Sequence, residues 1–574
     1  MATSWEIAAK TKREAVLDLI PKEWRIQPPL PPAGELRDVT GSYIQQFLSP
    51  REIEITETDT IGIVQRTTTG EWTAVEVTKA FCHRAAIAHQ LVNCLHEIFF
   101  EAALADAKRL DAYFVEHKRP TGPLHGLPIS LKDQFHVKGV ETTMGYVGWI
   151  GTFEGDKTDP RRFELESELV RELRALGAVL HCKTSVPATL MSGETINNII
   201  EYTWNPKNRH LSCGGSSGGE GALIALRGSA GGFGTDIGGS VRIPAAFNGL
   251  YGIRPSAGRI PYLGAANSMD GQISLRSVIG PLASSASGVK LLLKSVLSQH
   301  PWLYDPLCVE IPWRSEIEEH TLDLIQKSSS SQGQLAFGIM YDDGFVKPHP
   351  PITRALQVVA TLLQKLGHKV IEWKPPSHAT AAELASTIYG LDGGADASKQ
   401  FGLSGETMMP QVIIPNPPVP PKNAMEIAAI NIAKREYLKL YMDYWNDTAA
   451  STGTGRPIDG VIAPVAPHAA VQPMKYFYVG YSAFVNTLDY SSVTIPVTEA
   501  DKAVDVVDGN YTPINDTDRA VYESYDPEIY HGAPVGLQLM GRRFQEEKML
   551  TLAGYIGDEL RRASGSWSPI SSQL

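Results

Sequence analysis

Cysteine is scarce in this chain of 574 residues, which contains only five. Their number is odd and no two of them form a C-x-x-C pair, so the pattern excludes a disulfide framework and offers no zinc site. Scattered single cysteines are typical of reduced thiols inside a cell. We therefore expect a cytoplasmic protein.

Long apolar runs are also missing. No stretch of the sequence stays apolar over the roughly 20 residues that a membrane-spanning helix requires. The N-terminal stretch "MATSWEIAAKTKREAVLDLIPKEW" carries too many charges for a secretory signal peptide. We expect no membrane partner.

The chain also lacks a basic cluster. It has 52 Lys and Arg against 63 Asp and Glu, which gives a net charge of -11. Proteins that bind nucleic acid usually present a basic patch or stripe. Nucleic acid is therefore not expected as a partner.

The length fits one large domain with insertions. Residues 1–60 predict an amphipathic helix and then a proline-rich extended arm, which could wrap the body or a partner subunit and so leaves a homodimer open. Residues 61–562 are expected to form the main domain, with its functional core at about 120–265 and a proline-rich surface excursion near 405–425. Residues 563–574 are expected to be a flexible tail.

Two segments share an order of helix, glycine and strand. Leucines at helical spacing precede Gly177 and an apolar run, and the same order recurs around Gly367. This alternation predicts an α/β protein. A long helical pattern that starts with Thr73 as its cap predicts one helix, or two helices broken near Asn93.

Glycine is concentrated in "LSCGGSSGGEGALIALRGSAGGFGTDIGGSVRIPAAFNGLYGIRPSAGRIP". The region has no G-x-x-x-x-G-K-[ST] and no G-x-G-x-x-G after a strand, so a nucleotide-binding loop is disfavoured. Residues 215–219 match G-x-S-x-G, with Ser217 in the nucleophile position of an α/β-hydrolase. The polar stretch before them does not predict the strand that such a nucleophile elbow needs.

The glycines of "DIGGS", residues 236–240, have another use. Their backbone N–H groups could converge on one point, as an oxyanion hole requires, with Ser240 beside the charge that it creates. A serine needs a base, and no histidine in this region has a suggestive acidic neighbour. Lys132, after the apolar "LPISL", is the candidate base because burial lowers the pKa of a lysine. A salt-bridged or edge-strand lysine is the alternative.

Two long motifs carry a family resemblance. The stretch "GGSSGGEGALIALRGSAGGFGTDIGGSVRIPAAFNGLYGIRPS" is similar to the signature sequence of the amidase signature family of serine hydrolases, and "GPLHGLPISLKD" is similar to its lysine motif. The block "LVNCLHEIFFEAALADAKRLDAYF" and the C-terminal "YHGAPVGLQLMGRR" resemble fungal amidases of the acetamidase type. The resemblance covers most of the chain and implies a single large α/β/α domain with a mixed, mainly parallel central sheet.

The resemblance also implies a catalytic relay. Ser240 would be the nucleophile that is acylated, Ser216 a bridging serine held by a cis peptide bond, and Lys132 the terminal base. Ser217 would then not be the nucleophile, in spite of its G-x-S-x-G match.

The same resemblance implies how the substrate is held. The backbone N–H groups of Ile237, Gly238, Gly239 and Ser240 would form the oxyanion hole, and Met191 would line the acyl pocket, with a role in core packing as its alternative.

Two features near this site stay open. Asp236 and Arg242 could pair to brace the loop, or could be two separately solvated charges. The aromatic cluster "MKYFYVGYSAF", from Met474 to Phe484, could narrow the pocket or belong to the core.

The expected activity is hydrolysis of a small carboxamide to a carboxylic acid and ammonia through an acyl-serine, with no metal and no other cofactor. A carbamate (urethane) hydrolase is one alternative, because a carbamate presents the same carbonyl to the same site. A glutaminase-type subunit of an amidotransferase complex is the other. In each reading the expected partner is a small-molecule amide or carbamate substrate.

Overall fold

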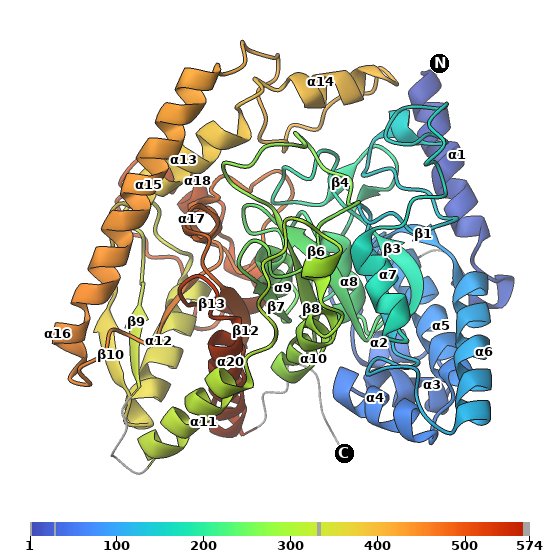
Figure 1. Ribbon diagram of the computed structural model, residues 1–574. Helices are drawn as coiled ribbons and strands as arrows, with labels where there is room; N and C mark the ends of the chain where they lie inside the picture. Colours follow the sequence, from blue (N-terminus) through green and yellow to red (C-terminus); the bar gives the residue numbers. More distant parts are fainter. Residues whose placement is uncertain (1–2, 28–29, 330–334, 566–574) are drawn as a thin grey trace.

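The computed structural model describes residues 3–27, 30–329 and 335–565. A sheet of 11 strands runs through the molecule in the order β1-β3-β2-β6-β8-β7-β12-β13-β11-β9-β10 (Figure 1). Its strands are β1 (Leu95–Ile98), β2 (Pro128–Lys132), β3 (Val179–Thr184), β6 (Gly231–Asp236), β7 (Tyr251–Arg254), β8 (Val278–Ala283), β9 (Ala336–Ile339), β10 (Lys369–Glu372), β11 (Gly460–Pro464), β12 (Ser492–Glu499) and β13 (Pro534–Met540). A separate ribbon pairs β4 (Ile196–Asn197) with β5 (Glu201–Tyr202).

Parallel pairing occurs in two groups of neighbouring strands. β2 lies parallel between β3 and β6, and β9 lies parallel between β10 and β11. The strands between these groups, and the edge strand β1, pair antiparallel. The mixed sheet is as expected. Its middle is less parallel than expected because neighbours such as β7 and β8 are joined by the loop 255–277, without the helical crossover that a parallel connection usually has.

Helices cover both faces of the sheet, which confirms the expected α/β/α arrangement (Figure 1). The α-helices are α1 (Ser4–Asp18), α2 (Ser42–Gln45), α3 (Pro50–Glu57), α4 (Thr60–Thr69), α5 (Ala74–Val92), α6 (Phe100–His117), α7 (Glu168–Ala175), α8 (Gly218–Ala225), α9 (Arg242–Phe247), α10 (Ala286–Leu297), α11 (Ser315–Ser329), α12 (Pro350–Lys365), α13 (His378–Tyr389), α14 (Ala395–Gly402), α15 (Ala424–Asp447), α16 (Ala449–Thr452), α17 (Gly480–Leu488), α18 (Asp516–Glu523), α19 (Pro527–Tyr530) and α20 (Glu546–Ser564). Among the residues that the structure describes, no helix is both long and apolar enough to cross a bilayer.

Strand β6 explains several glycines of the glycine-rich region. Successive residues of a strand point to opposite faces, and a Cβ on Gly231 would lie 2.9 Å from a leucine of α10, whereas one on Gly232 would lie 1.8 Å from Oε2 of Glu220 in α8. A Cβ on Gly234 would lie 2.4 Å from the Ser217 hydroxyl oxygen. Helices α10 and α8 therefore cover opposite faces, and the glycines let α8 approach the strand more closely than a side chain would allow.

The N-terminal arm packs against its own chain. Val39 is fully buried, and its N–H donates to the Pro206 carbonyl at 2.9 Å. Arg209 Nη1 donates to the carbonyls of Pro31 and Leu36 at 2.9 and 3.1 Å. The arm thus wraps the body, and the homodimer stays a prediction.

Both ends of the chain are more helical than expected. The extended arm ends early because α3 begins after Ser49, which forms a capping box with Glu52 and is followed by Pro50 at the first helical position. At the other end α20 runs to Ser564. The rest of the expected flexible tail, residues 566–574, lies outside the described residues.

The helical pattern that starts at Thr73 is two helices. Thr73 caps α5 by accepting a hydrogen bond from a backbone N–H, and Asn93 ends that helix in a left-handed conformation. The short strand β1 between α5 and α6 was not expected. The helix, glycine and strand pattern is confirmed twice, since Gly177 lies between α7 and β3 and Gly367 lies between α12 and β10.

The proline-rich excursion joins α14 to α15 through residues 403–423 and contains neither helix nor strand. The expectation that it lies on the surface holds only in part. Val412 and Ile414 are buried, because these apolar side chains pack toward the body. The N–H of Ile413 donates to the carbonyl of Met191 at 2.9 Å, which ties the excursion to the functional core.

A variant of Lys12, in α1, can test whether the N-terminal helix packs against the rest of the fold. Lys12 Nζ lies 2.6 Å from Glu97 Oε1 and 2.7 Å from Glu141 Oε2. Burial raises the pKa of Glu97 to about 7, although Lys12 opposes this shift, so Glu97 is largely ionised at pH 8. We expect Lys12→Met to destabilise the protein by about 3 kcal/mol at pH 8, because it leaves a buried carboxylate unpaired.

The measurement is the shift in thermal melting temperature. Lys10→Met is the matched control on the same helix, since Lys10 forms only an exposed pair with Glu14 and is expected to change stability by less than about 0.5 kcal/mol. If both variants changed the melting temperature equally little, the result would contradict the claim that Lys12 fixes α1 to the body of the protein.

Candidate active site

The glycine loop between β6 and α9 forms one wall of a cavity. β6 ends at Asp236 and α9 begins at Arg242, so Ser240 lies in the loop that joins them. Ser240 is 7% exposed and lines the cavity together with Ile237 and Gly238. The chain reverses direction here within a few residues, and the loop needs support to hold one shape.

A buried ion pair supplies that support. Arg242 Nε and Nη2 donate to the two carboxylate oxygens of Asp236 at 3.0 and 3.1 Å, and both side chains are fully buried. Burial alone would raise the pKa of Asp236, but Arg242 and other donors hold that pKa at about 2. Asp236 also accepts the N–H of Gly239 at 2.8 Å and that of Val241 at 3.2 Å. Asp236 and Arg242 therefore pair and brace the loop, which confirms one of the two expected arrangements. The other, in which the two charges are solvated separately, is wrong.

Other donors of Arg242 join the loop to distant segments. Nη1 donates to Gln538 Oε1 of β13 at 2.7 Å, and Nη2 donates to Asn486 Oδ1 of α17 at 2.7 Å. Both nitrogens also donate to the Ser482 carbonyl at 3.2 and 3.1 Å. Arg242 thus ties the loop to a helix and a strand that follow it by more than 200 residues.

The carbonyl groups of the loop are held away from the cavity. Tyr389 donates to the Ile237 carbonyl at 2.8 Å, and the N–H of Ile243 donates to the Gly239 carbonyl at 2.7 Å. In a trans peptide the N–H points opposite to the C=O, so the N–H groups of Gly238 and Ser240 face the other way. Within the described residues these two N–H groups, like that of Ile237, have no hydrogen-bond acceptor. They can bind a negatively charged oxygen.

Gly239 corrects one expectation. Its N–H was expected to face the substrate, but it donates to Asp236 because the carboxylate lies directly under the turn. Gly239 instead supplies backbone shape: its φ is 124°, and a Cβ there would lie 2.5 Å from Cβ of Ser482. Only glycine fits both the dihedral angle and the space.

Lys132 ends the inner strand β2 and is fully buried. Its Nζ donates to Ser216 Oγ at 2.8 Å and to Thr235 Oγ1 at 2.7 Å. Thr235 in turn donates to Gln134 Oε1 at 2.6 Å. Lys132 forms no ion pair among the described residues, and β2 lies between β3 and β6, so both alternatives, a salt-bridged lysine and an edge-strand lysine, are wrong.

Burial sets the protonation of this lysine. It lowers the pKa of Lys132 to about 7, against the opposing effect of Asp236 and Glu220. Glu220 is itself buried, and burial raises its pKa to about 8, although hydrogen bonds from Ser130 and Thr184 oppose the rise. Near pH 7 a large fraction of Lys132 is a neutral amine that can accept a proton.

The two serines of "GGSSGG" have different surroundings. The bond between Gly215 and Ser216 is cis, and the Ser216 hydroxyl accepts the hydrogen bond from Lys132. The Ser217 hydroxyl is fully buried and exchanges hydrogen bonds with the backbone of Thr235 at 3.3 Å. The N–H of Ser217 donates to the Ser240 carbonyl at 3.1 Å, which places this turn beside the glycine loop.

The rest of the cavity is mostly apolar and has a volume of about 80 Å³. Met191 lies on its wall, as expected for an acyl pocket. Tyr476, Tyr478 and their neighbours also line it, so part of the aromatic cluster narrows the cavity. Ile413 closes it from the proline-rich excursion.

Several supporting residues were missed by the sequence analysis. Gln134 lies two residues beyond Lys132, and Thr235 lies next to Asp236 in the quoted loop, so both were near enough in sequence to be candidates. Ser482 lies within the aromatic cluster from Met474 to Phe484, although the sequence did not single it out. Tyr389 had no such signal, because it reaches the loop only through the fold.

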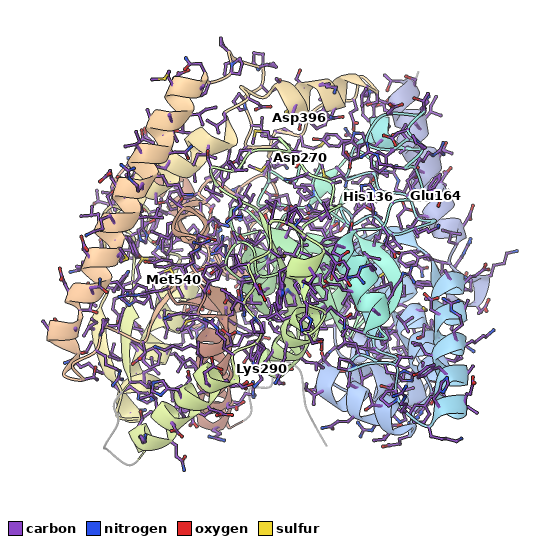
Figure 2. The ribbon with its side chains drawn as sticks, viewed as in Figure 1. His136, Glu164, Asp270, Lys290, Asp396 and Met540 are labelled. Carbon is purple, nitrogen blue, oxygen red and sulfur yellow. The ribbon has the colours of Figure 1, made fainter. Side chains whose placement is uncertain are left out.

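Figure 2 shows side chains filling the space around the sheet, with Asp270 and Asp396 labelled at the end of the molecule where α14 lies. The N–H of Met269 donates to Asp396 Oδ2 at 2.9 Å, and Ser268 donates to the Thr189 carbonyl at 2.6 Å. These contacts connect the loop 255–277 with α14 and with the segment that carries Met191.

Residues 76–550 match the family model described as Amidase. The chain is 49% identical to an acetamidase of Aspergillus oryzae over 557 residues, which cover 97% of this chain and 99% of that protein. It is 46% identical to an acetamidase of Emericella nidulans over 558 residues, which cover 97% and 98%.

The fold also has a counterpart among solved structures. The structure of a fatty acid amide hydrolase superposes with a TM-score of 0.86 at 32% sequence identity, and the match covers 97% of this chain and 95% of that one. A 6-aminohexanoate cyclic dimer hydrolase has a TM-score of 0.66 at 20% identity over 88% and 97% of the two chains, which is a likeness of fold alone.

The bracing pair gives a stability prediction. We expect Asp236→Asn to destabilise the protein by about 3 to 5 kcal/mol, because it leaves the buried Arg242 guanidinium without its counter-charge. The measurement is thermal melting, with the double variant Asp236→Asn/Arg242→Met as the comparison. The double variant should be less destabilised than the two single variants would add up to, and strict additivity would contradict a direct pair.

Proposed function

Because the chain belongs to the amidase signature family of amide-hydrolysing enzymes, we propose that it hydrolyses small, acetamide-like carboxamides to a carboxylic acid and ammonia. Ser240 is the nucleophile in this proposal, and Ser216 and Lys132 relay its proton. The observation that carries it is the hydrogen bond of 2.8 Å between the buried Lys132 amine and Ser216, in a turn that contacts the backbone of Ser240.

The first half of the reaction forms the acyl-enzyme. Ser240 Oγ attacks the amide carbonyl while its proton passes to Ser216 Oγ, and the Ser216 proton passes to the neutral amine of Lys132. The carbonyl oxygen becomes an oxyanion, which the N–H groups of Ile237, Gly238 and Ser240 stabilise. The relay then runs backward, the leaving nitrogen takes a proton, and the C–N bond breaks to release ammonia.

The second half repeats the relay with water. A water molecule gives its proton to Ser216 and Lys132 as it attacks the acyl carbon, and the same N–H groups hold the second oxyanion. Collapse of this intermediate breaks the bond to Ser240 Oγ, which recovers its proton, and releases the carboxylic acid. At the end of each half of the reaction, Lys132 has returned the proton that it accepted and is a neutral amine again.

The size of the cavity supports a small substrate. A water needs roughly 10 to 15 Å³ of such space, so a cavity of about 80 Å³ accepts a ligand of only a few heavy atoms. The acetamidases among the relatives agree with this size. Ethyl carbamate has the same carbonyl, and including it in the substrate panel tests the alternative of carbamate hydrolysis.

Two serine variants test the assignment of the nucleophile. Ser240→Ala should lower kcat on acetamide by about 10⁴- to 10⁶-fold, because no oxygen remains to form the acyl-enzyme. Ser217→Ala should stay within about tenfold of the wild type, since its hydroxyl bonds only the backbone of Thr235. Steady-state ammonia release measures both, and the reverse order of the two losses would contradict the relay.

The pH dependence tests the lysine. A protonated Lys132 cannot accept a proton, so kcat/KM should rise about tenfold per pH unit below pH 7 and level off above it, because the pKa of Lys132 is about 7. Lys132→Arg, which stays charged, should lose at least about 100-fold at every pH. Melting temperatures at each pH control for unfolding, and a flat profile from pH 5.5 to 8.5 would count against this base.

A further inference from the structure

Two buried polar atoms on the cavity wall have no partner. Oε1 of Gln411 and the hydroxyl of Tyr476 make no hydrogen bond within the described part of the chain, and both residues line the cavity that holds Ser240. Buried polar groups nearly always have a hydrogen-bond partner. Two such atoms on one small cavity therefore indicate a ligand that supplies the missing partners.

Other polar side chains on this wall are already occupied. The Tyr389 hydroxyl donates to the Ile237 carbonyl, and the Tyr478 hydroxyl donates to Asp343 at 2.6 Å. The Ser192 hydroxyl accepts the N–H of Glu194 at 3.1 Å. The unpartnered pair thus stands apart from its neighbours.

Tyr476 lies next to the glycine loop. Burial raises the pKa of its hydroxyl. The hydroxyl of Ser482 donates to the carbonyls of Gly238 and Val479. Tyr476 and Gly238 line the same cavity, so the Tyr476 ring is near the place where a substrate carbonyl would bind.

Tyr476 is held by contacts of its own, and Gln411 lies two residues before a backbone hydrogen bond that anchors its segment. The N–H of Tyr476 donates to Glu194 Oε1 at 3.3 Å, and its ring packs against that of His468 in a tilted arrangement with centroids 5.5 Å apart. Gln411 precedes Ile413, whose N–H is bonded to the Met191 carbonyl. The two polar groups come from separate segments that converge on one cavity.

The part of the substrate that Gln411 and Tyr476 can bind follows from what the other groups of the site already bind. A small carboxamide has an apolar acyl group, which Met191 and Ile413 can contact, and a carbonyl oxygen, which the loop N–H groups can bind. Its remaining polar part is the nitrogen with two N–H donors. The side-chain oxygen of a glutamine is an acceptor only, and a tyrosine hydroxyl can accept as well as donate.

We propose that Gln411 and Tyr476 accept the two N–H groups of the substrate and so select unsubstituted carboxamides over esters of the same acid. This inference rests on the proposed function, because it assigns the nitrogen side of that same substrate. The two residues determine specificity and take no proton in the relay.

The test compares an amide with an ester. Acetamide and methyl acetate give the same acetyl-enzyme, but only acetamide has N–H groups to lose. Gln411→Leu and Tyr476→Phe should each lower kcat/KM on acetamide by about 10- to 100-fold and change kcat/KM on methyl acetate by less than about threefold. The ratio of the two substrates is therefore the readout.

Tyr478→Phe is the matched control, since Tyr478 lines the same cavity but its hydroxyl is bound to Asp343. It should change the amide-to-ester ratio by less than about twofold. Equal losses on both substrates in the Gln411 and Tyr476 variants, or no loss, would overturn the inference. A wild-type enzyme that hydrolyses neither substrate would instead overturn the proposed function.

Discussion

The ion pair between Asp236 and Arg242 is the constraint on which the site depends. One carboxylate accepts the guanidinium and the N–H groups of Gly239 and Val241, so it fixes the loop at both sides of Ser240. Because the pair is fully buried, neither member can rotate into solvent without leaving the other uncompensated. Within the described residues the N–H groups of Ile237, Gly238 and Ser240 have no acceptor, so the braced loop leaves them available to stabilise an oxyanion.

A second constraint acts on Lys132, the proposed base. Lys132 is buried at the end of an inner strand, and the close approach of α8 to β6 brings Ser216 within 2.8 Å of its amine. The glycines of β6 permit that approach, and the resulting loss of solvent lowers the pKa of Lys132 to about 7. Packing and chemistry thus have one cause here: the small residues that bring helix and strand together also create the dry environment in which a lysine can act as a base.

Much of this was predictable from the sequence, for a physical reason. Lys132 and Ser240 lie within local patterns, a lysine after an apolar strand and a serine after glycines, whose chemistry can be recognised without the fold. Ser216 was predicted by the family resemblance, because the local G-x-S-x-G pattern pointed to Ser217 instead. The hydrogen bond from the N–H of Gly239 to Asp236 was not predictable, because it depends on the orientation of the Asp236 carboxylate in the folded protein. Residues far along the chain that bind Arg242 or line the cavity, such as Asn486 and Gln411, were not predictable either. Nothing in their local sequence marks them as part of the site. Short-range patterns and the family resemblance predicted the proposed reacting groups, and long-range packing determines what supports them.

The most direct test of the account is to identify the side chain that becomes acylated. A fluorophosphonate reacts covalently with an activated serine, and peptide mass spectrometry then locates the modified residue. The account predicts one label per chain, on Ser240, and strongly reduced labelling in Lys132→Met, which keeps the shape of the side chain but cannot accept a proton. A label on Ser217, or undiminished labelling of Ser240 without the lysine, would contradict the proposed relay.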